Sequence, residues 1–145
     1  MKKIEFKKIM HESSLYDIQF KKEEKLKELM MLKKEEDMLI EQRENMRGGN
    51  GIINFQHIFR QDEMQAKCRL CAKITVPVGA SIGVHQHNDE DEIFVIQKGQ
   101  GICDDGENRK KFVAGDAILT VHGGKHSIEN TGDEDIQFIA IVMPY

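Results

Sequence analysis

Short apolar runs separated by turn residues recur along the last two thirds of the chain. Val, Ile, Phe and other strand formers predominate in each run, and clusters of Gly, Asp and Asn stand between the runs. Many short strands at this density are typical of a β-sandwich or a β-barrel. The predicted strands span residues 53–59, 66–76, 81–87, 92–98, 101–103, 111–113, 117–121, 125–129 and 136–143.

The first 48 residues follow a different pattern. Residues 1–20 mix charged and apolar side chains without a regular period, which favours an irregular arm. Residues 21–47 contain no Gly or Pro and are rich in Lys, Glu, Leu and Met, a composition that predicts a charged amphipathic helix. The glycines that follow would end this helix. We therefore expect an arm and helix over residues 1–48 and a β-domain over residues 49–145.

The predicted helix carries equal numbers of basic and acidic residues, which argues against binding to a membrane surface. We expect it to pack against the β-domain of its own chain or of a dimer mate. The alternative is a dedicated helix for recognising a separate partner. The prediction for the whole protein is a homodimer.

Length and charge narrow the class of protein. The 145 residues are the size of one domain with a core of its own. The net charge of −4, without a basic stretch that interleaves aromatic residues, argues against nucleic-acid binding. The chain has neither an apolar run long enough to span a membrane nor the apolar N-terminal core of a secretion signal. We predict a cytoplasmic protein that does not bind membranes.

Three cysteines agree with a reducing compartment, because an odd number does not complete a disulfide framework. Cys68 and Cys71 have the spacing of half a zinc site or of a redox pair. They fall within a predicted strand, where residues three apart face opposite sides, and no second such pair follows. We therefore expect these two residues and Cys103 to be structural thiols.

Candidate chemistry is concentrated in two stretches that contain His. His85 and His87 lie one residue apart on a predicted strand, so both project to the same side, with Cα atoms about 7 Å apart. Glu92 opens the next strand, and His126 lies on a distant hairpin. Two imidazoles at this spacing suit one metal ion, which a carboxylate and a third imidazole would complete. For an isolated His pair, an exposed position on the strand is the alternative.

The spacing of these residues resembles that of the cupin family. Gly79, five residues, His85-x-His87, four residues, Glu92, six residues and Gly99 match the first cupin motif throughout. The acidic residues 89–91, which precede Glu92, could also supply a carboxylate ligand if composition alone is considered. We expect them instead to form a solvated turn.

The second cupin motif is matched with one departure. Gly115, five residues, Val121, His122, Gly123, two residues, His126, three residues and Asn130 follow its spacing. Val121 stands where the family has Pro, which would stiffen the turn by fixing φ. The departure bears on the rigidity of that loop and leaves the His ligand in place.

The resemblance covers about residues 50–145. It implies an all-β fold, the cupin double-stranded β-helix or jelly-roll barrel, preceded here by the N-terminal helical extension. It also implies the roles of individual residues. The implied metal ligands are His85, His87, Glu92 and His126, the turn glycines are Gly79, Gly99, Gly115 and Gly123, and Asn130 is structural. Phe94 and Ile96 share the alternation of Glu92 and would line the barrel wall.

The expected chemistry follows from the ligand set. Three neutral imidazoles and one carboxylate around a divalent ion leave a charge of +1, and a six-coordinate ion keeps two open positions, which favour a small anionic ligand. Nitrogen and oxygen ligands suit Mn, Fe, Ni, Co or Zn. We predict an enzyme of the oxygenase, isomerase or lyase type that acts on a small oxygen-rich anion. The alternative is a non-catalytic, metal-dependent binding or sensor module. No general base is assigned, and His11, His57 and His122 are expected to lie outside the site.

Overall fold

Nine strands predicted from the sequence are present in the structure, and a tenth precedes them. The computed structural model describes residues 29–145, and residues 34–145 form one unit of strands joined by turns and three short 3-10 helices. The 3-10 helices are η1 (Glu35–Asp37), η2 (Met46–Gly48) and η3 (Gln61–Glu63). The strands are β1 (Leu39–Glu44), β2 (Ile52–Phe59), β3 (Leu70–Val76), β4 (Ser81–Gln86), β5 (Glu90–Lys98), β6 (Gln100–Asp104), β7 (Arg109–Val113), β8 (Ala117–Thr120), β9 (Lys125–Glu129) and β10 (Ile136–Pro144).

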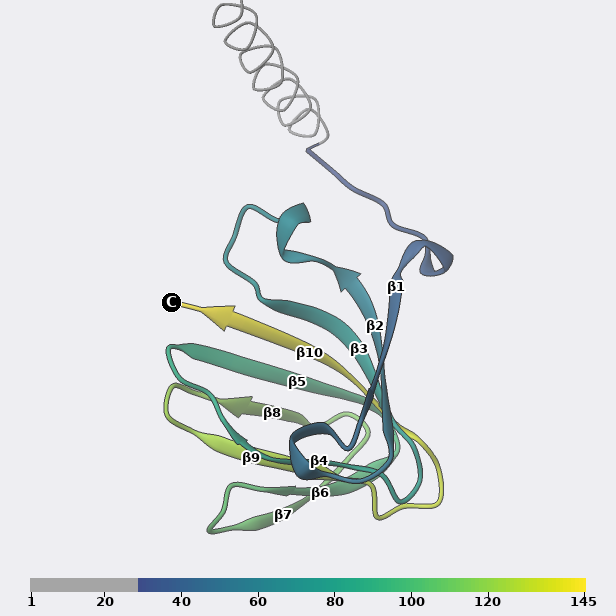
Figure 1. Ribbon diagram of the computed structural model, residues 1–145, viewed down its shortest axis with the longest axis vertical. Helices are drawn as coiled ribbons and strands as arrows, with labels where there is room; N and C mark the ends of the chain where they lie inside the picture. Colours follow the sequence, from purple (N-terminus) through teal and green to yellow (C-terminus); the bar gives the residue numbers. More distant parts are fainter. Residues whose placement is uncertain (1–28) are drawn as a thin grey trace, which may run out of the picture. The chain divides into compact units, whose positions relative to one another are not determined.

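The strands form two antiparallel sheets that pack face to face. The six-stranded sheet has the order β1-β2-β3-β10-β5-β8, and the four-stranded sheet has the order β4-β9-β6-β7. Figure 1 shows β3, β10, β5 and β8 side by side, with the four-stranded sheet next to them. Strands close in sequence therefore often lie in different sheets, and this confirms the predicted β-sandwich of the cupin type.

The core fills the space between the inner faces of the sheets. Along β10, Ile136, Phe138, Ala140 and Val142 are buried, and the residues between them are partly exposed. The same alternation places Phe55 of β2 in the core. Each Ile, Phe or Val side chain among them contributes about 1.5–3 kcal/mol when it leaves water. The pattern of every second apolar residue thus decides which face of each strand turns inward.

The helix expected over residues 21–47 is wrong for the part that the structure describes. Residues 39–44 form strand β1, which pairs antiparallel with β2 from Leu39 opposite His57 to Glu44 opposite Ile52. The glycines expected to stop a helix instead lie in the turn between these two strands. Residues 1–28, where the arm and the start of the helix were expected, lie outside the described residues.

Contacts across the sheet explain why helix-forming residues adopt a strand here. The Arg43 guanidinium lies 4.3 Å from the centre of the Phe55 ring. Glu41 accepts two hydrogen bonds from Arg43, and its Oε2 lies 2.8 Å from His57 Nε2. Glu41 and Arg43 face inward because each lies opposite an inward residue of β2. Tertiary partners thus outweigh the local helix propensity of this segment.

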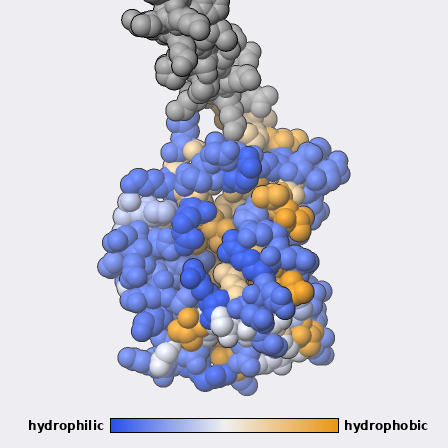
Figure 2. Space-filling view, in the orientation of Figure 1, coloured by the Kyte–Doolittle hydropathy of each residue, from blue (hydrophilic) through white to orange (hydrophobic). Residues whose placement is uncertain are grey.

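Most of the visible surface is hydrophilic. Hydrophilic residues cover most of the face in Figure 2, and apolar residues form separate patches among them. Within residues 29–145, no helix has the length and apolar character needed to cross a membrane.

Substitution of Glu41 tests whether its contacts with Arg43 and His57 stabilise β1. Hydrogen bonds from Arg43 and His57 lower the pKa of Glu41 to about 2. A lowered folded pKa stabilises the protein above the unfolded pKa, and this stabilisation is lost as the pH falls from about 4.5 towards about 2. We expect Glu41→Gln to lower the free energy of unfolding at pH 7 by no more than about 1 kcal/mol, because Glu41 is partly exposed.

The measurement is urea unfolding of wild type and variant at several pH values. The difference in stability should shrink as the medium becomes acidic. Glu44→Gln is the matched control, since Glu44 is an exposed carboxylate on the same strand. A difference for Glu41→Gln that does not vary with pH would contradict the role of its charge.

Candidate metal centre

An extra residue in strand β4 turns two histidines into the space between the sheets. Ile82 lies opposite Ile128 and His85 lies opposite His126, so three steps along β4 match two along β9. Such a bulge reverses the alternation of side chains. Ile82 and His87 are therefore both buried, whereas Val84 between them is exposed. Without the bulge, a strand with Ile82 in the core would direct these histidines outward.

Gly83 stands at the bulge because another backbone crosses there. A Cβ atom at Gly83 would lie 2.0 Å from the carbonyl oxygen of Arg47. A Cβ atom at Gly49 would lie 2.1 Å from the carbonyl oxygen of Ser81. Since only glycine allows so close an approach, the crossing of η2 over β4 depends on these two positions.

Glu92 and His126 reach the same space from neighbouring strands. His126 lies on β9 directly opposite His85. Glu92 lies on β5 opposite Thr120 of β8. The six-stranded sheet therefore supplies the carboxylate, and β4 with the residue after it and β9 supply the imidazoles. His85 and His126 are 41 positions apart in the sequence. The packing of the two sheets brings them and the other two residues together.

The four side chains converge through specific atoms. Nε2 of His126 lies 3.1 Å from Nε2 of His85 and 3.2 Å from Nε2 of His87. Glu92 Oε2 lies 2.8 Å from Nε2 of both His87 and His126. All four ligand atoms lie within 4.8 Å of one another. The spacing expected from the sequence thus produces one compact cluster.

The opposite ring nitrogens show how these imidazoles are oriented. His85 Nδ1 lies 3.0 Å from the carbonyl oxygen of Gly83, and His87 Nδ1 lies 2.7 Å from Glu90 Oε1. Both oxygens are acceptors, so these contacts favour the tautomer with the hydrogen on Nδ1, in which Nε2 presents a lone pair. Thr120 Oγ1 lies 2.8 Å from His126 Nδ1 and can accept in the same way. Burial also lowers the pKa of His85, which favours the neutral ring.

Glu92 shows that this arrangement fits a cation. Its Oε2 atom is buried and accepts no hydrogen bond from the described residues, although two ring nitrogens lie 2.8 Å away. Those nitrogens direct lone pairs at it when their Nδ1 atoms hold the hydrogens. A buried carboxylate without a donor is costly unless a positive charge offsets it. Three nitrogens and one carboxylate oxygen suit a divalent transition metal, and the cluster fits a cupin metal site.

Phe94 forms one wall of the cluster, as its alternation with Glu92 predicts. Its ring stacks on that of His126 with 4.9 Å between centroids and packs on Phe138 at 4.4 Å. Ile96, two residues further, lies deeper in the core. The cluster therefore rests on the apolar core, which limits the movement of His126.

A cavity of about 250 Å³ leads to the cluster between the two sheets. Ile118 and Thr120 of β8 line it from one sheet, and His126 lines it from the other. Lys110, Lys125 and the turn between β6 and β7 complete the lining. A small molecule can therefore lie next to His126.

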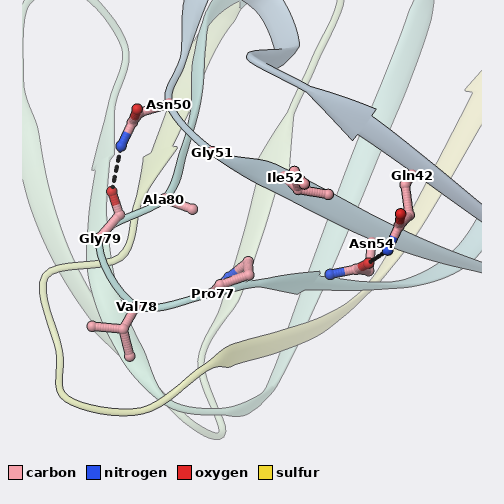
Figure 3. A pocket seen from close by; sticks show the side chains of 9 residues that line it. All are labelled: Gln42, Asn50, Gly51, Ile52, Asn54, Pro77, Val78, Gly79 and Ala80. Atoms are coloured by element: carbon pink, nitrogen blue, oxygen red, sulfur yellow. Dashed lines mark hydrogen bonds between the residues drawn. The ribbon is translucent and has the colours of Figure 1, made fainter.

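A larger hollow of about 530 Å³ lies at the other end of β4 (Figure 3). Its lining has amide and aliphatic groups and no titratable side chain. Figure 3 shows Asn50 turned to Gly79 and Gln42 turned to Asn54, each pair joined by a hydrogen bond. These amides satisfy one another, and none of the residues expected in the metal site lies here. The candidate metal cluster therefore lies apart from this hollow.

The acidic turn before Glu92 differs in part from the expected solvated turn. Asp89 is exposed, and Asp91 accepts hydrogen bonds from the Tyr145 hydroxyl and the His122 N–H on the rim. Glu90, by contrast, is mostly buried and binds His87. Glu90 lies two residues before Glu92 on β5, so both side chains project from the same face of the strand. This spacing could have identified Glu90 from the sequence.

The second-motif residues have the expected structural roles. Gly123 has a φ of +80°, and the side chain of buried Asn130 donates to the carbonyl oxygens of Val76 and Glu134, both at 2.9 Å. The His122 side chain is more than half exposed on the rim, and its Nδ1 accepts a hydrogen bond from the Asp89 N–H. The sequence did not single out Thr120, whose hydroxyl contacts a ligand ring.

The cysteines lie outside the cluster. Cys68, Cys71 and Cys103 are free thiols, and Cys68 is buried. Cys103 borders the cavity beside the cluster. Burial raises the pKa of Cys68 and of Cys103, which favours the unreactive thiol.

Comparison with known proteins agrees with the resemblance to the cupin family. The family described as Cupin domain matches residues 72–142. An oxalate-binding protein of Thermotoga maritima is 40% identical over 99 residues, which cover 68% of this chain and 82% of that protein.

Solved structures agree with this similarity. The crystal structure of a predicted oxalate decarboxylase from Thermotoga maritima is similar with a TM-score of 0.75 and 36% identity, over 79% of this chain and all of that one. The polyketide cyclase RemF from Streptomyces resistomycificus has a TM-score of 0.63 at 16% identity, over 80% of each chain. The second likeness concerns the fold alone.

Gly83 provides a test of the bulge. We expect Gly83→Ala to lower the free energy of unfolding by about 2 kcal/mol or more, because its methyl group meets a backbone oxygen that side-chain motion does not relieve. Chemical denaturation measures this change. Val84→Ala, which alters an exposed residue of the same bulge, should change stability by about 0.5 kcal/mol or less. Equal stability of Gly83→Ala and wild type would refute the close crossing.

Proposed function

This chain belongs to the cupin family, and on that basis we propose that it binds one divalent transition-metal ion and, through that ion, a small dicarboxylate of the oxalate class. The ligands would be His85, His87, Glu92 and His126. The observation that carries the proposal is the convergence of three ring nitrogens on a buried carboxylate oxygen that has no hydrogen-bond donor. The similarity to an oxalate-binding protein supports the choice of anion.

The charge of the proposed centre favours an anion. Three neutral imidazoles and one carboxylate leave +1 on a divalent ion, and four protein ligands leave room for others on a six-coordinate metal. A bound ion would supply Lewis-acid polarisation of the oxygens of the ligand. We propose Mn, Fe, Ni, Co or Zn, since all accept this mixed nitrogen and oxygen set.

The cavity beside His126 supports the proposed size and charge of the ligand. Lys110 and Lys125 contribute positive charge to its lining. Two acidic residues also line the cavity: Asp105 accepts hydrogen bonds from the N–H groups of its own turn and interacts with the charge of Lys110, and Asp104 lies 3.6 Å from Arg109. We propose that Lys125, on the strand of His126, attracts a second carboxylate group in this cavity.

A second candidate function is cleavage of the carbon–carbon bond of such a dicarboxylate. The similarity to a structure described as a predicted oxalate decarboxylase favours it. Both candidates need the same anion at the same centre. They differ in whether product forms, so one experiment can separate an enzyme of the lyase type from a non-catalytic binding module.

Metal content tests the four ligands. We expect purified protein to bind about one divalent ion per chain and His87→Ala to lose most of it, because one of three nitrogen ligands is removed. Elemental analysis after dialysis measures the ratio. His122→Ala is the control, since His122 is exposed on the rim, and should retain the metal. Full metal content in His87→Ala would refute the ligand assignment.

Calorimetric titration with oxalate tests the anion. Metal-loaded protein should bind oxalate, whereas metal-free protein should bind at least tenfold more weakly, because the open positions on the ion are lost. Acetate, which has one carboxylate, is the control ligand and should bind more weakly than oxalate. Equal affinity for oxalate with and without metal would contradict the proposal.

The same metal-loaded sample should be incubated with carbon-13 oxalate and followed by NMR. Formate and carbon dioxide would identify a decarboxylase. Binding without any product, with each proposed metal in turn, would identify a binding module.

A further inference from the structure

Glu90 joins the metal cluster to the surface through two sets of contacts. Its Oε1 lies 2.7 Å from His87 Nδ1, on the side of the ring away from the cluster. On its other side, Arg69 Nε lies 2.9 Å from Glu90 Oε2, and an Arg69 terminal nitrogen lies 2.5 Å from Oε1. The Glu90 side chain is only 12% exposed, whereas that of Arg69 is 53% exposed. A continuous chain of contacts therefore runs from the surface to a ligand of the proposed metal.

Strand geometry separates Glu90 from the acidic residues beside it. Glu90 and Glu92 lie two residues apart on β5, so their side chains share the inner face of the sheet. Asp91 between them turns to the rim, where it meets the Tyr145 hydroxyl. Asp89 is 88% exposed. Of the three acidic residues before Glu92, only Glu90 contacts a residue of the cluster.

The partner of His87 differs from those of the other two rings. His85 Nδ1 faces a backbone carbonyl oxygen, and His126 Nδ1 faces a hydroxyl, both of them neutral groups. His87 Nδ1 faces a carboxylate. Hydrogen bonds to a charged acceptor are shorter and about twice as strong as neutral ones. His87 is therefore the ring whose Nδ1 has a charged acceptor.

Arg69 keeps Glu90 in the form that this role needs. Its Nε and a terminal nitrogen both donate to the Glu90 carboxylate, and a guanidinium is always charged, so Glu90 is paired as an acceptor that faces His87. Two parallel contacts from a guanidinium also fix the plane of the carboxylate. The Arg69 backbone N–H donates to the carbonyl oxygen of Val142 at 2.8 Å, which anchors the arginine to strand β10.

We propose that Arg69 and Glu90 are positioning residues that preset His87 for metal binding, with Glu90 holding the Nδ1–H tautomer and Arg69 holding Glu90. The inference rests on the proposed metal site. Neither residue touches the metal. Such outer partners of a ligand His typically change metal affinity by about 10–100-fold when they are removed.

The first test uses full-length protein without metal, so that it does not depend on function. Nitrogen-15 NMR of the ring, with His87 assigned by comparison with His87→Gln, reports which nitrogen carries the hydrogen. We expect wild type to show the Nδ1–H tautomer and Glu90→Ala to show a mixture with Nε2–H. Glu90→Gln keeps an oxygen acceptor and should restore much of the Nδ1–H form. A general loss of structure would not produce this selective rescue.

The second test measures metal affinity by competition with a chelator, using Mn or Zn. Glu90→Ala should weaken binding by about 10–100-fold, Glu90→Gln by less, and Arg69→Met by a smaller factor than Glu90→Ala. Asp91→Asn controls for charge in the same turn. Arg60→Met controls for loss of a surface ion pair, since Arg60 pairs with exposed Asp62. Both controls should stay within about twofold of wild type.

The outcomes separate this inference from the proposed function. An unchanged His87 tautomer in Glu90→Ala, or metal affinity within twofold of wild type in that variant, would overturn the positioning role. If wild type binds metal and fails to bind oxalate, the choice of anion fails and the role of the pair stands on its own measurements. If wild type binds none of the metals, the proposed metal site fails and the inference falls with it.

Discussion

The convergence of four electron-rich atoms in a buried space is the constraint on which the rest of this structure depends. Lone pairs of three imidazoles and a carboxylate oxygen repel one another and gain little from water in the interior. Such a cluster persists only if the surrounding fold is rigid enough to hold it and a positive charge can offset it. Strands from both sheets therefore have to meet at this point, and the apolar core beneath Phe94 provides the rigidity.

The fold satisfies this constraint through one irregularity in an otherwise regular pattern. Ile82 belongs to the core and His87 belongs to the cluster, yet strict alternation would place them on opposite faces of β4. The extra residue at Gly83 resolves the conflict, and the crossing backbone at Arg47 occupies the space that a side chain would need. The backbone crossing that Gly83 and Gly49 permit therefore affects both the stability of the fold and the position of the histidines.

The sequence predicts the strands after residue 53 because they depend on local alternation, and it predicts the four cluster residues because they match the spacing of the two cupin motifs. Strand β1 was not predicted, because its Glu and Arg residues have a high intrinsic helix propensity. Their contacts with Phe55 and His57 of the neighbouring strand stabilise the strand conformation instead. The bulge in β4 could not be predicted from local sequence either, because the backbone that crosses it at Arg47 lies far away in the sequence. Glu90 has the same charge as its neighbours, and only its strand position sets it apart. The homodimer, the cytoplasmic location and the division of residues 1–48 from the rest stay predictions.

The charge balance around the cluster links the outer residues to the choice of ligand. A divalent ion with three neutral imidazoles and Glu92 would carry +1, and a lone carboxylate at Glu90 would cancel that charge at short range. Arg69 pairs with Glu90 through two contacts, so the pair is close to neutral as seen from the cluster. The carboxylate can then orient His87 without removing the positive charge that draws an anion. In the proposed centre, the surface arginine would thus preserve the charge that an anion needs.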